Sequence, residues 1–185
     1  MIVVDLIKEI VAKVSTNLTP DLQRLDSRIT GVHFMNGHPL EVIETLAQKD
    51  KSNTFRFEKY PLVALFQDFA EVHTGNIGAP LELTLHLIIA RATRPEYKAS
   101  ERYEKNFKPF LYPIYNEFLR QLNLSGLFMI YNSSIIPHTK YDRLYWGKEG
   151  LFKNQGNIFD DYLDVIELKN LKLKLYKKTC KKWLK

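Results

Sequence analysis

The sequence has almost no cysteine and no long apolar segment. Its single cysteine, Cys180, cannot form an internal disulfide bond, which favours a reducing, intracellular compartment. The first residues lack the basic segment that precedes the apolar core of a secretory signal peptide. The longest apolar segment, 81–92, is interrupted by charged residues such as Glu82 and Arg91, so we expect no membrane span.

Recognisable catalytic motifs are missing as well. There is no GxSxG sequence, and the glycine-containing segment 75–78 lacks the GxxxxGKS/T pattern of a phosphate-binding loop. No pair of histidines has the spacing of zinc ligands among His33, His38, His73, His86 and His138. We interpret His86, on the polar face of a predicted strand, as a histidine with ordinary hydrogen-bond partners. The sequence therefore predicts a protein that is not an enzyme and has no cofactor or metal.

Four acidic residues toward the C-terminal end offer an alternative interpretation as a divalent-metal site. They are Asp160, Asp161, Asp164 and Glu167. A helical turn would bring Asp161 and Asp164 together, as a metal-dependent nuclease would need. No histidine lies near them in the sequence and Glu167 falls in a predicted strand, so we favour a solvated loop over a metal site.

Positive charge is concentrated at the C-terminal end. From residue 169 onward the chain has eight lysines and no acidic residue, which exceeds the net charge of +6 for the whole chain. The part of the chain before them is therefore slightly acidic. We predict that these lysines contact a polyanion or an acidic partner, the candidates being Lys172, Lys174, Lys177, Lys178, Lys181 and Lys182. A lysine-rich edge and tail that only prevent aggregation explain the same pattern, and both interpretations stay open.

Length and apolar periodicity predict a single α+β domain over 1–176, followed by a lysine-rich tail over 177–185. We predict helices over 2–14, 39–48 and 100–122, and strands over 29–35, 60–66, 81–92, 127–131, 141–146 and 165–175. We predict a loop over 18–26, because it contains Pro20, and a turn at Asn36-Gly37. The fold class is then a mixed or antiparallel β-sheet packed against an N-terminal helix and a long kinked central helix.

The predicted elements have specific local features. Pro109 and Pro113 each remove a backbone donor from the central helix, so we expect it to be kinked or broken there. Ser100 is the predicted N-cap of that helix. The apolar residues of segment 165–175 change parity at Lys169-Asn170, so we predict a β-bulge that restores one apolar face. Strand 60–66 is expected to be buried on both faces and to form a hairpin with strand 81–92.

Several segments, in their order along the chain, carry a resemblance to a known class of proteins. An N-terminal helix comes first and a long helix lies in the middle, and the segments around them are 60–66 (YPLVALF), 83–90 (LTLHLIIA), 141–147 (YDRLYWG) and 161–175 (DYLDVIELKNLKLKL). In this order and texture the chain resembles the small neck, head–tail connector and tail-terminator (tail completion) ring proteins of tailed bacteriophages. The double proline of the central helix departs from that pattern.

The resemblance implies a structural, non-catalytic virion protein assembled in the host cytoplasm. It implies a ring of six or twelve copies that joins the portal or capsid side to the tail, with neighbouring portal, neck or tail proteins as partners. Genomic DNA would pass through the channel without sequence-specific contact, and no membrane is involved. Loops 73–80 and 132–157 lie where such proteins extend arms to their neighbours. The alternative is a nucleic-acid-binding accessory protein that uses the lysine-rich C-terminus.

Overall fold

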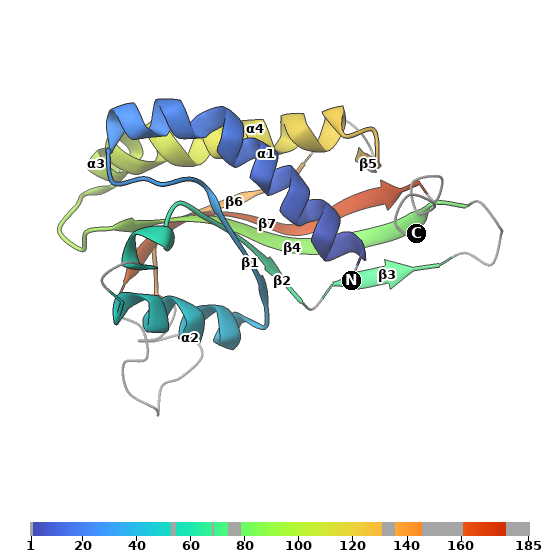
Figure 1. The fold of residues 1–185 in the computed structure, drawn as a ribbon, viewed down its shortest axis with the longest axis horizontal. Helices are drawn as coiled ribbons and strands as arrows, with labels where there is room; N and C mark the ends of the chain where they lie inside the picture. The colour runs from blue at the N-terminus through green and yellow to red at the C-terminus, as the bar shows by residue number, and fades with distance from the viewer. Residues whose placement is uncertain are drawn as a thin grey trace.

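A seven-stranded mixed sheet forms the centre of the molecule, with helices on both of its faces (Figure 1). The computed structural model describes residues 2–52, 55–67, 69–73, 79–130, 136–145 and 161–176. The predicted α+β class is confirmed, including the N-terminal helix and the long kinked central helix over 99–124. Among the described residues, no helix has both the length and the hydropathy that a membrane span requires.

The helical elements, in chain order, are α1 (Ile2–Leu25), α2 (Pro39–Asp50), the short 3-10 helix η1 (Phe55–Glu58), α3 (Ala99–Arg102), the π-helical segment η2 (Tyr103–Leu111) and α4 (Tyr112–Leu124). The strands are β1 (His33–Gly37), β2 (Leu62–Phe66), β3 (Ala70–Val72), β4 (Leu81–Thr93), β5 (Phe128–Ile130), β6 (Thr139–Tyr145) and β7 (Tyr162–Leu175). Their order in the sheet is β1-β2-β4-β7-β5, with β3 also paired to β4 and β6 to β7.

The sheet is mixed because β1 and β2 run parallel, and α2 supplies the crossover that a parallel pair requires. Pro39 begins α2, as predicted, and the His38 ring accepts a hydrogen bond from the Leu40 amide at 3.2 Å. The predicted turn at Asn36-Gly37 is wrong. These two residues extend β1 and pair with Leu65 and Phe66 of β2, so the strand lies later in the chain than we predicted.

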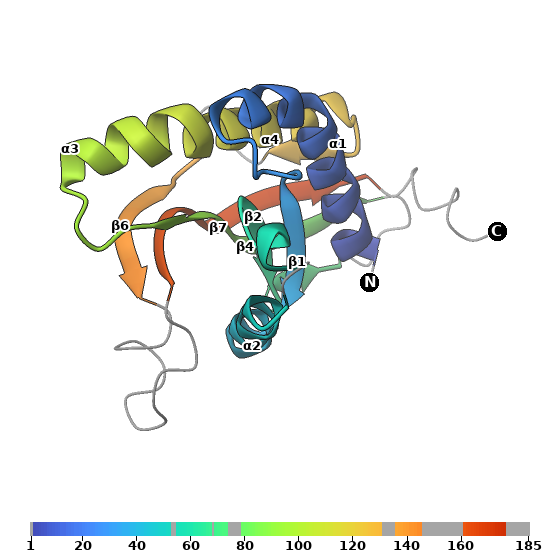
Figure 2. The same cartoon turned by 60° about the vertical axis from the view of Figure 1, so that its left-hand side comes forward.

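Helices cover the two faces of the sheet unequally (Figure 2). The sheet separates the core into two clusters, one on each face. On one face, α1, η2 and α4 pack over β2, β4 and β7. On the other face, α2 covers a smaller cluster that includes Leu62, Ala64, Ile88 and Val165. All five residues of β2 are buried, which confirms the prediction of a strand covered on both faces. The predicted antiparallel pairing of β2 with β4 is also confirmed.

The N-terminal helix continues through the segment we predicted to be a loop. Pro20 lies inside α1, although its ring nitrogen cannot donate a hydrogen bond. Leu22, in the last turn, is buried in the core, and the Thr19 hydroxyl donates to the Ser15 carbonyl at 2.6 Å. Burial of the last apolar turn and this local hydrogen bond therefore outweigh the proline penalty, which makes the loop prediction wrong.

The central helix changes its winding where its prolines lie. Pro109 is inside the π-helical segment η2, and Pro113 is in the first turn of α4. Proline lacks an N–H, and its ring clashes with the carbonyl four residues earlier, so the wider π turns relieve a conflict that a regular helix would impose. The helix begins at Ala99 with Lys98 as its N-cap, so the prediction of Ser100 as the cap is wrong.

The two longest strands, β4 and β7, form an antiparallel ribbon with the predicted β-bulge. Leu85 pairs with Leu171 and Leu87 with Leu168, so β7 contains one residue more than β4 over this interval. Asn170 has a φ of 65°, in the left-handed region. The extra residue keeps the apolar side chains on both sides of the bulge on the same face of the sheet. The β-bulge at Lys169-Asn170 is thus confirmed.

Candidate functional site

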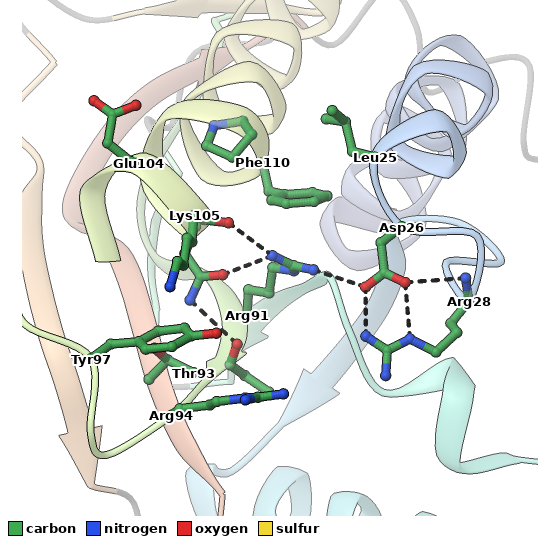
Figure 3. Close-up of a pocket in the computed structure, with 13 residues that line it drawn as sticks. Leu25, Asp26, Arg28, Arg91, Thr93, Arg94, Tyr97, Glu104, Lys105 and Phe110 are labelled. Carbon is green, nitrogen blue, oxygen red and sulfur yellow. Dashed lines mark hydrogen bonds and ion pairs between the residues drawn. The ribbon is translucent and has the colours of Figure 1, made fainter. Parts of the chain in front are cut away.

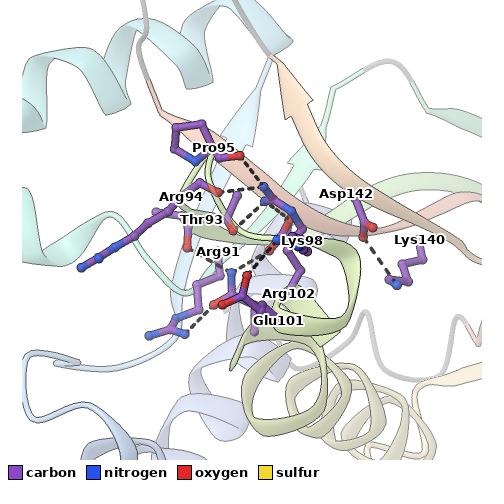
Figure 4. A network of polar contacts seen from close by, with 12 residues as sticks. Arg91, Thr93, Arg94, Pro95, Lys98, Glu101, Arg102, Lys140 and Asp142 are labelled. Atoms are coloured by element: carbon purple, nitrogen blue, oxygen red, sulfur yellow. Dashed lines mark hydrogen bonds and ion pairs between the residues drawn. The ribbon is translucent and has the colours of Figure 1, made fainter. Parts of the chain in front are cut away.

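An ion pair lies buried between the first turns of the central helix and β7, and Figure 4 shows its arginine, Arg102, beside Thr93 and Arg94. The Arg102 guanidinium is 3.3 Å from an Asp164 carboxylate oxygen, and both residues have a relative exposure of 0%. Burying two charges is costly unless further hydrogen bonds satisfy them. Arg102 also donates to the Thr93 hydroxyl at 2.8 Å and to the Arg94 carbonyl at 2.7 Å. Arg102 therefore holds the segment after β4 against the central helix.

Asn106 of η2 extends this buried pair into a longer polar chain. Its side-chain nitrogen donates to Asp164 at 2.6 Å, and its side-chain oxygen accepts from Arg91 at 2.7 Å. Arg91, near the end of β4, then donates to Asp26 at 3.0 Å. Asp26 also accepts from the Arg28 Nε at 2.9 Å. The chain thus runs from the buried side of β7 to the surface beside the end of α1.

The outer part of this chain lines a pocket of about 630 Å³ (Figure 3). We define the arginine pocket by six of its lining residues, which are Asp26, Arg28, Arg91, Arg94, Tyr97 and Lys105. They come from the loop after α1, the end of β4, the loop after β4 and η2. Its two acidic lining residues, Asp26 and Glu104, are outnumbered by four basic ones. The pocket therefore favours an anionic ligand over a cation.

Contacts with neighbouring residues hold the charges of Arg91, Arg28 and Asp26 in place. Arg91 stacks on the Phe110 ring, with its guanidinium carbon 3.4 Å from the ring centroid. Burial lowers the pKa of Arg91, and the neighbouring Asp26 carboxylate opposes that effect. The hydrogen bond from Arg28 lowers the pKa of Asp26, so Asp26 stays ionised. Arg94 is exposed, and it makes no ion pair with any residue in the described ranges.

Sequence reasoning did not find this pocket. Its residues are separated by long stretches of chain, and only folding brings Asp26, Arg91 and Asn106 together. The one signal in the sequence was Arg91, which we treated only as an interruption of an apolar strand. A charged residue at the end of a buried strand needs a partner, and that requirement was the available clue.

The predicted lysine site is only partly described by the structure. Lys172 and Lys174 both lie on the polar face of β7, as predicted, and Lys172 is exposed. The Lys174 ammonium lies 3.2 Å from Glu82 on β4, so part of its charge is already neutralised. The other four candidates, Lys177, Lys178, Lys181 and Lys182, lie outside the described residues, as do most of loops 73–80 and 132–157.

The three acidic residues of this set that the structure describes, Asp161, Asp164 and Glu167, have separate partners and do not form one site. Asp164 is buried in β7 with Arg102, so our assignment of it to a solvated loop is wrong. Asp161 instead accepts hydrogen bonds from Lys59 and from the Tyr60 hydroxyl. Asp160 lies outside the described residues. Within the described part of the chain, no three His, Cys, Asp or Glu side chains are placed to hold a metal ion together.

His86 has the ordinary partners that we predicted for it. Its Nε2 lies 2.6 Å from a Glu167 carboxylate oxygen on the neighbouring strand β7. Its ring also packs edge-on against Phe66, with centroids 4.7 Å apart. These contacts satisfy the imidazole on the polar face of the ribbon, and they also show that Glu167 is engaged with a histidine.

Five of the exposed apolar side chains in the described part of the chain lie at two separate places in the fold. The β5 patch consists of Leu124, Met129 and Tyr176, where α4 leads into β5, and Leu124 is 64% exposed and Met129 48% exposed. The Tyr176 hydroxyl donates to the Met129 sulfur at 3.6 Å. The η1 patch consists of Phe55 and Phe57, which are 51% and 39% exposed. Large exposed apolar side chains that cluster mark candidate protein–protein contacts.

Comparison with known proteins places no further constraint on the site. No family model matches the chain, and no curated protein matches it. The chemistry of the described residues is therefore the basis for a function. That chemistry combines a buried structural ion pair, a cationic pocket above it and two exposed apolar patches.

Proposed function

We propose that this protein is a non-catalytic structural subunit that assembles into a ring in the neck or tail of a tailed bacteriophage. Its neighbours in the virion are then further copies of itself and portal, neck or tail proteins. The observation that carries the proposal is the presence of two different exposed apolar patches, the β5 patch and the η1 patch, on one subunit.

Two different patches suit a head-to-tail contact, in which one patch of each copy meets the other patch of the next. Such contacts generate closed rings when the rotation between copies closes. Figure 2 shows α2 on the opposite side of the sheet from α1 and α4, and η1 follows α2 whereas β5 follows α4. The two patches can therefore contact different neighbours at the same time.

The edges of the sheet support the same proposal. β1 and β5 end the strand order, and each pairs with a neighbour on one side. Within the described ranges, no strand pairs with the outer side of either one. Free backbone donors and acceptors at a strand edge can pair with another chain, which adds directional contacts to the apolar ones.

A substitution at the centre of the β5 patch tests the proposal. Met129→Lys places a charge on an exposed side chain of β5 without disturbing the core, so the folded subunit is expected to remain while assembly weakens. Light scattering coupled to size exclusion, with negative-stain images of the large species, measures the assembly state. Leu25→Lys is the matched control, because Leu25 is 59% exposed at the end of α1 and belongs to neither patch.

The proposal expects rings for the unchanged protein and for Leu25→Lys, and smaller species for Met129→Lys. Equal assembly of all three proteins would show that the β5 patch is not part of the contact between subunits. Catalytic turnover of a phosphodiester with added Mg²⁺ or Mn²⁺ would contradict the non-catalytic part of the proposal.

A further inference from the structure

We propose that the arginine pocket is a binding site for the phosphate groups of a nucleic-acid backbone. The inference goes beyond ring assembly, because it concerns a site on each subunit that the ring itself does not require. It also locates phosphate contacts away from the lysine-rich end that the sequence suggested. Figure 3 shows the side chains that carry it.

The pocket has basic groups left over after its internal pairs are counted. Asp26 bridges Arg28 and Arg91, with distances of 2.9 Å and 3.0 Å. Arg28 uses its Nε and one terminal nitrogen for Asp26, so its other terminal nitrogen keeps its N–H groups for a ligand. Glu104, the second acidic lining residue, pairs with Lys108 at 3.0 Å, and Figure 3 shows its carboxylate directed away from Arg91.

Arg94 is an exposed cation of the pocket with no ion pair to any described residue, so it is well placed to meet a ligand. It is exposed, and its guanidinium lies 5.8 Å from the centroid of the Tyr97 ring. Behind it, Arg91 is held by hydrogen bonds to Asp26, Asn106 and the Lys105 carbonyl. Arg91 therefore supplies a fixed positive charge at the back of the pocket, and Arg94 and Arg28 supply exposed donors.

The aromatic rings of the pocket favour backbone over base recognition. Lys105 covers one face of Tyr97, with its Nζ 4.1 Å from the ring centroid. Arg91 covers one face of Phe110 in the same way, with its guanidinium carbon 3.4 Å from the ring centroid. Because cations already occupy these faces, the pocket offers donors for phosphate oxygens and little platform for stacking a base. Its volume of about 630 Å³ exceeds the needs of a single small anion and suits a length of backbone.

The test is the binding of the full-length protein to a fluorescent DNA duplex, measured by anisotropy across a salt series. Arg94→Glu should weaken binding about tenfold and reduce the salt dependence by about one phosphate contact or more. Arg28→Gln should weaken it about threefold, with the same direction of change in salt dependence. Arg24→Glu is the matched control. Arg24 is an exposed arginine in the last turn of α1, four residues before Arg28, and it does not line the pocket.

Five results would overturn the inference. The first two are the absence of DNA binding by the unchanged protein and an equal loss for Arg94→Glu and Arg24→Glu. The next two are binding that disappears only when residues 177–185 are removed and equal competition by polyglutamate and by DNA. The fifth is a failure of inorganic tripolyphosphate to compete at matched charge, because competition by it is expected if phosphate groups suffice. Repeating the titration with Met129→Lys separates this result from ring assembly, since the pocket is intact in that variant.

Discussion

Asn106 donates a 2.6 Å hydrogen bond to the buried carboxylate of Asp164. The same amide accepts a hydrogen bond from Arg91, so one side chain of the π-helical segment connects the buried ion pair to the arginine pocket. The position of Arg91 in the pocket is therefore linked through Asn106 to the buried Asp164. Substitution of Asn106 or of Asp164 should therefore lower the stability of the fold more than it weakens ligand binding.

Removing the buried carboxylate should be strongly destabilising. Asp164→Ala leaves the Arg102 guanidinium buried without its counter-charge, and we expect a loss of about 3–5 kcal/mol in the free energy of unfolding. Urea denaturation measures it. Asp142→Ala is the control, because its contact with Lys140 is a partly exposed pair at 3.5 Å, expected to contribute at most about 1 kcal/mol. Similar losses for the two variants would show that the buried pair is not needed for stability.

Acidification should remove a contact between α1 and α4. The Glu117 carboxylate accepts hydrogen bonds from Arg120 and from Asn17 of α1, and the Arg120 contact above all lowers its pKa to about 2, below its usual value of 4.5. The stabilisation is therefore present above about pH 4.5 and is lost as the pH falls toward about 2.

Glu117→Gln tests this pH dependence. We expect it to cost about 1 kcal/mol at neutral pH, a modest value because Arg120 is largely exposed. Thermal unfolding of both proteins across the acidic range should show their difference shrinking toward zero at low pH. A difference that stays constant with pH would mean that the Glu117 charge has no role in the contact.

The β-bulge should depend on the left-handed conformation of Asn170. Asn170→Val forces a β-branched residue into a φ of 65°, and we expect it to cost about 1–2 kcal/mol. Asn170→Gly should be neutral or slightly stabilising, because glycine adopts this conformation freely. Lys169→Val, at the neighbouring exposed position, should change stability by less than about 0.5 kcal/mol. Chemical denaturation measures both losses. Equal losses for Asn170→Val and Lys169→Val would show that the left-handed conformation of Asn170 does not cause the destabilisation.

Gly31 should resist substitution because of a close approach to α1. A Cβ at this position would lie 2.7 Å from the Ser15 hydroxyl, which itself accepts a hydrogen bond from the Val32 amide at 2.9 Å. Gly31→Ala is expected to cost about 1–2 kcal/mol. The double variant with Ser15→Ala should cost less than the sum of the two single variants, because the clash is gone. Strict additivity of the unfolding free energies would argue against this contact.

Much of the fold could be predicted because its signals are local. The alternation of leucines in 81–92 and the parity change at Lys169-Asn170 both follow from the period of a strand. Pro20 misled us, since a proline is a local signal and the burial of Leu22 that overrides it is not. The turn at Asn36-Gly37 failed for a similar reason, because the parallel pairing with β2 depends on where α2 packs.

The candidate site was less predictable than the fold. The lysines of the C-terminal end were visible in the sequence because they lie close together along the chain, but the structure describes only part of that region. The arginine pocket is built from side chains of the loop after α1, of β4, of the loop after β4 and of η2, and no spacing in the sequence connects them. Asp164 illustrates the difficulty, because its neighbours in the sequence suggested an acidic loop while its true partner, Arg102, lies on the central helix.

The mass of the purified protein in solution, followed by light scattering over a wide concentration range, is the most direct test of ring assembly. We expect discrete ring species, visible in negative-stain images, that Met129→Lys reduces to smaller forms while the subunit stays folded. A folded protein that remains a monomer at every concentration would contradict assembly through the β5 patch and the η1 patch.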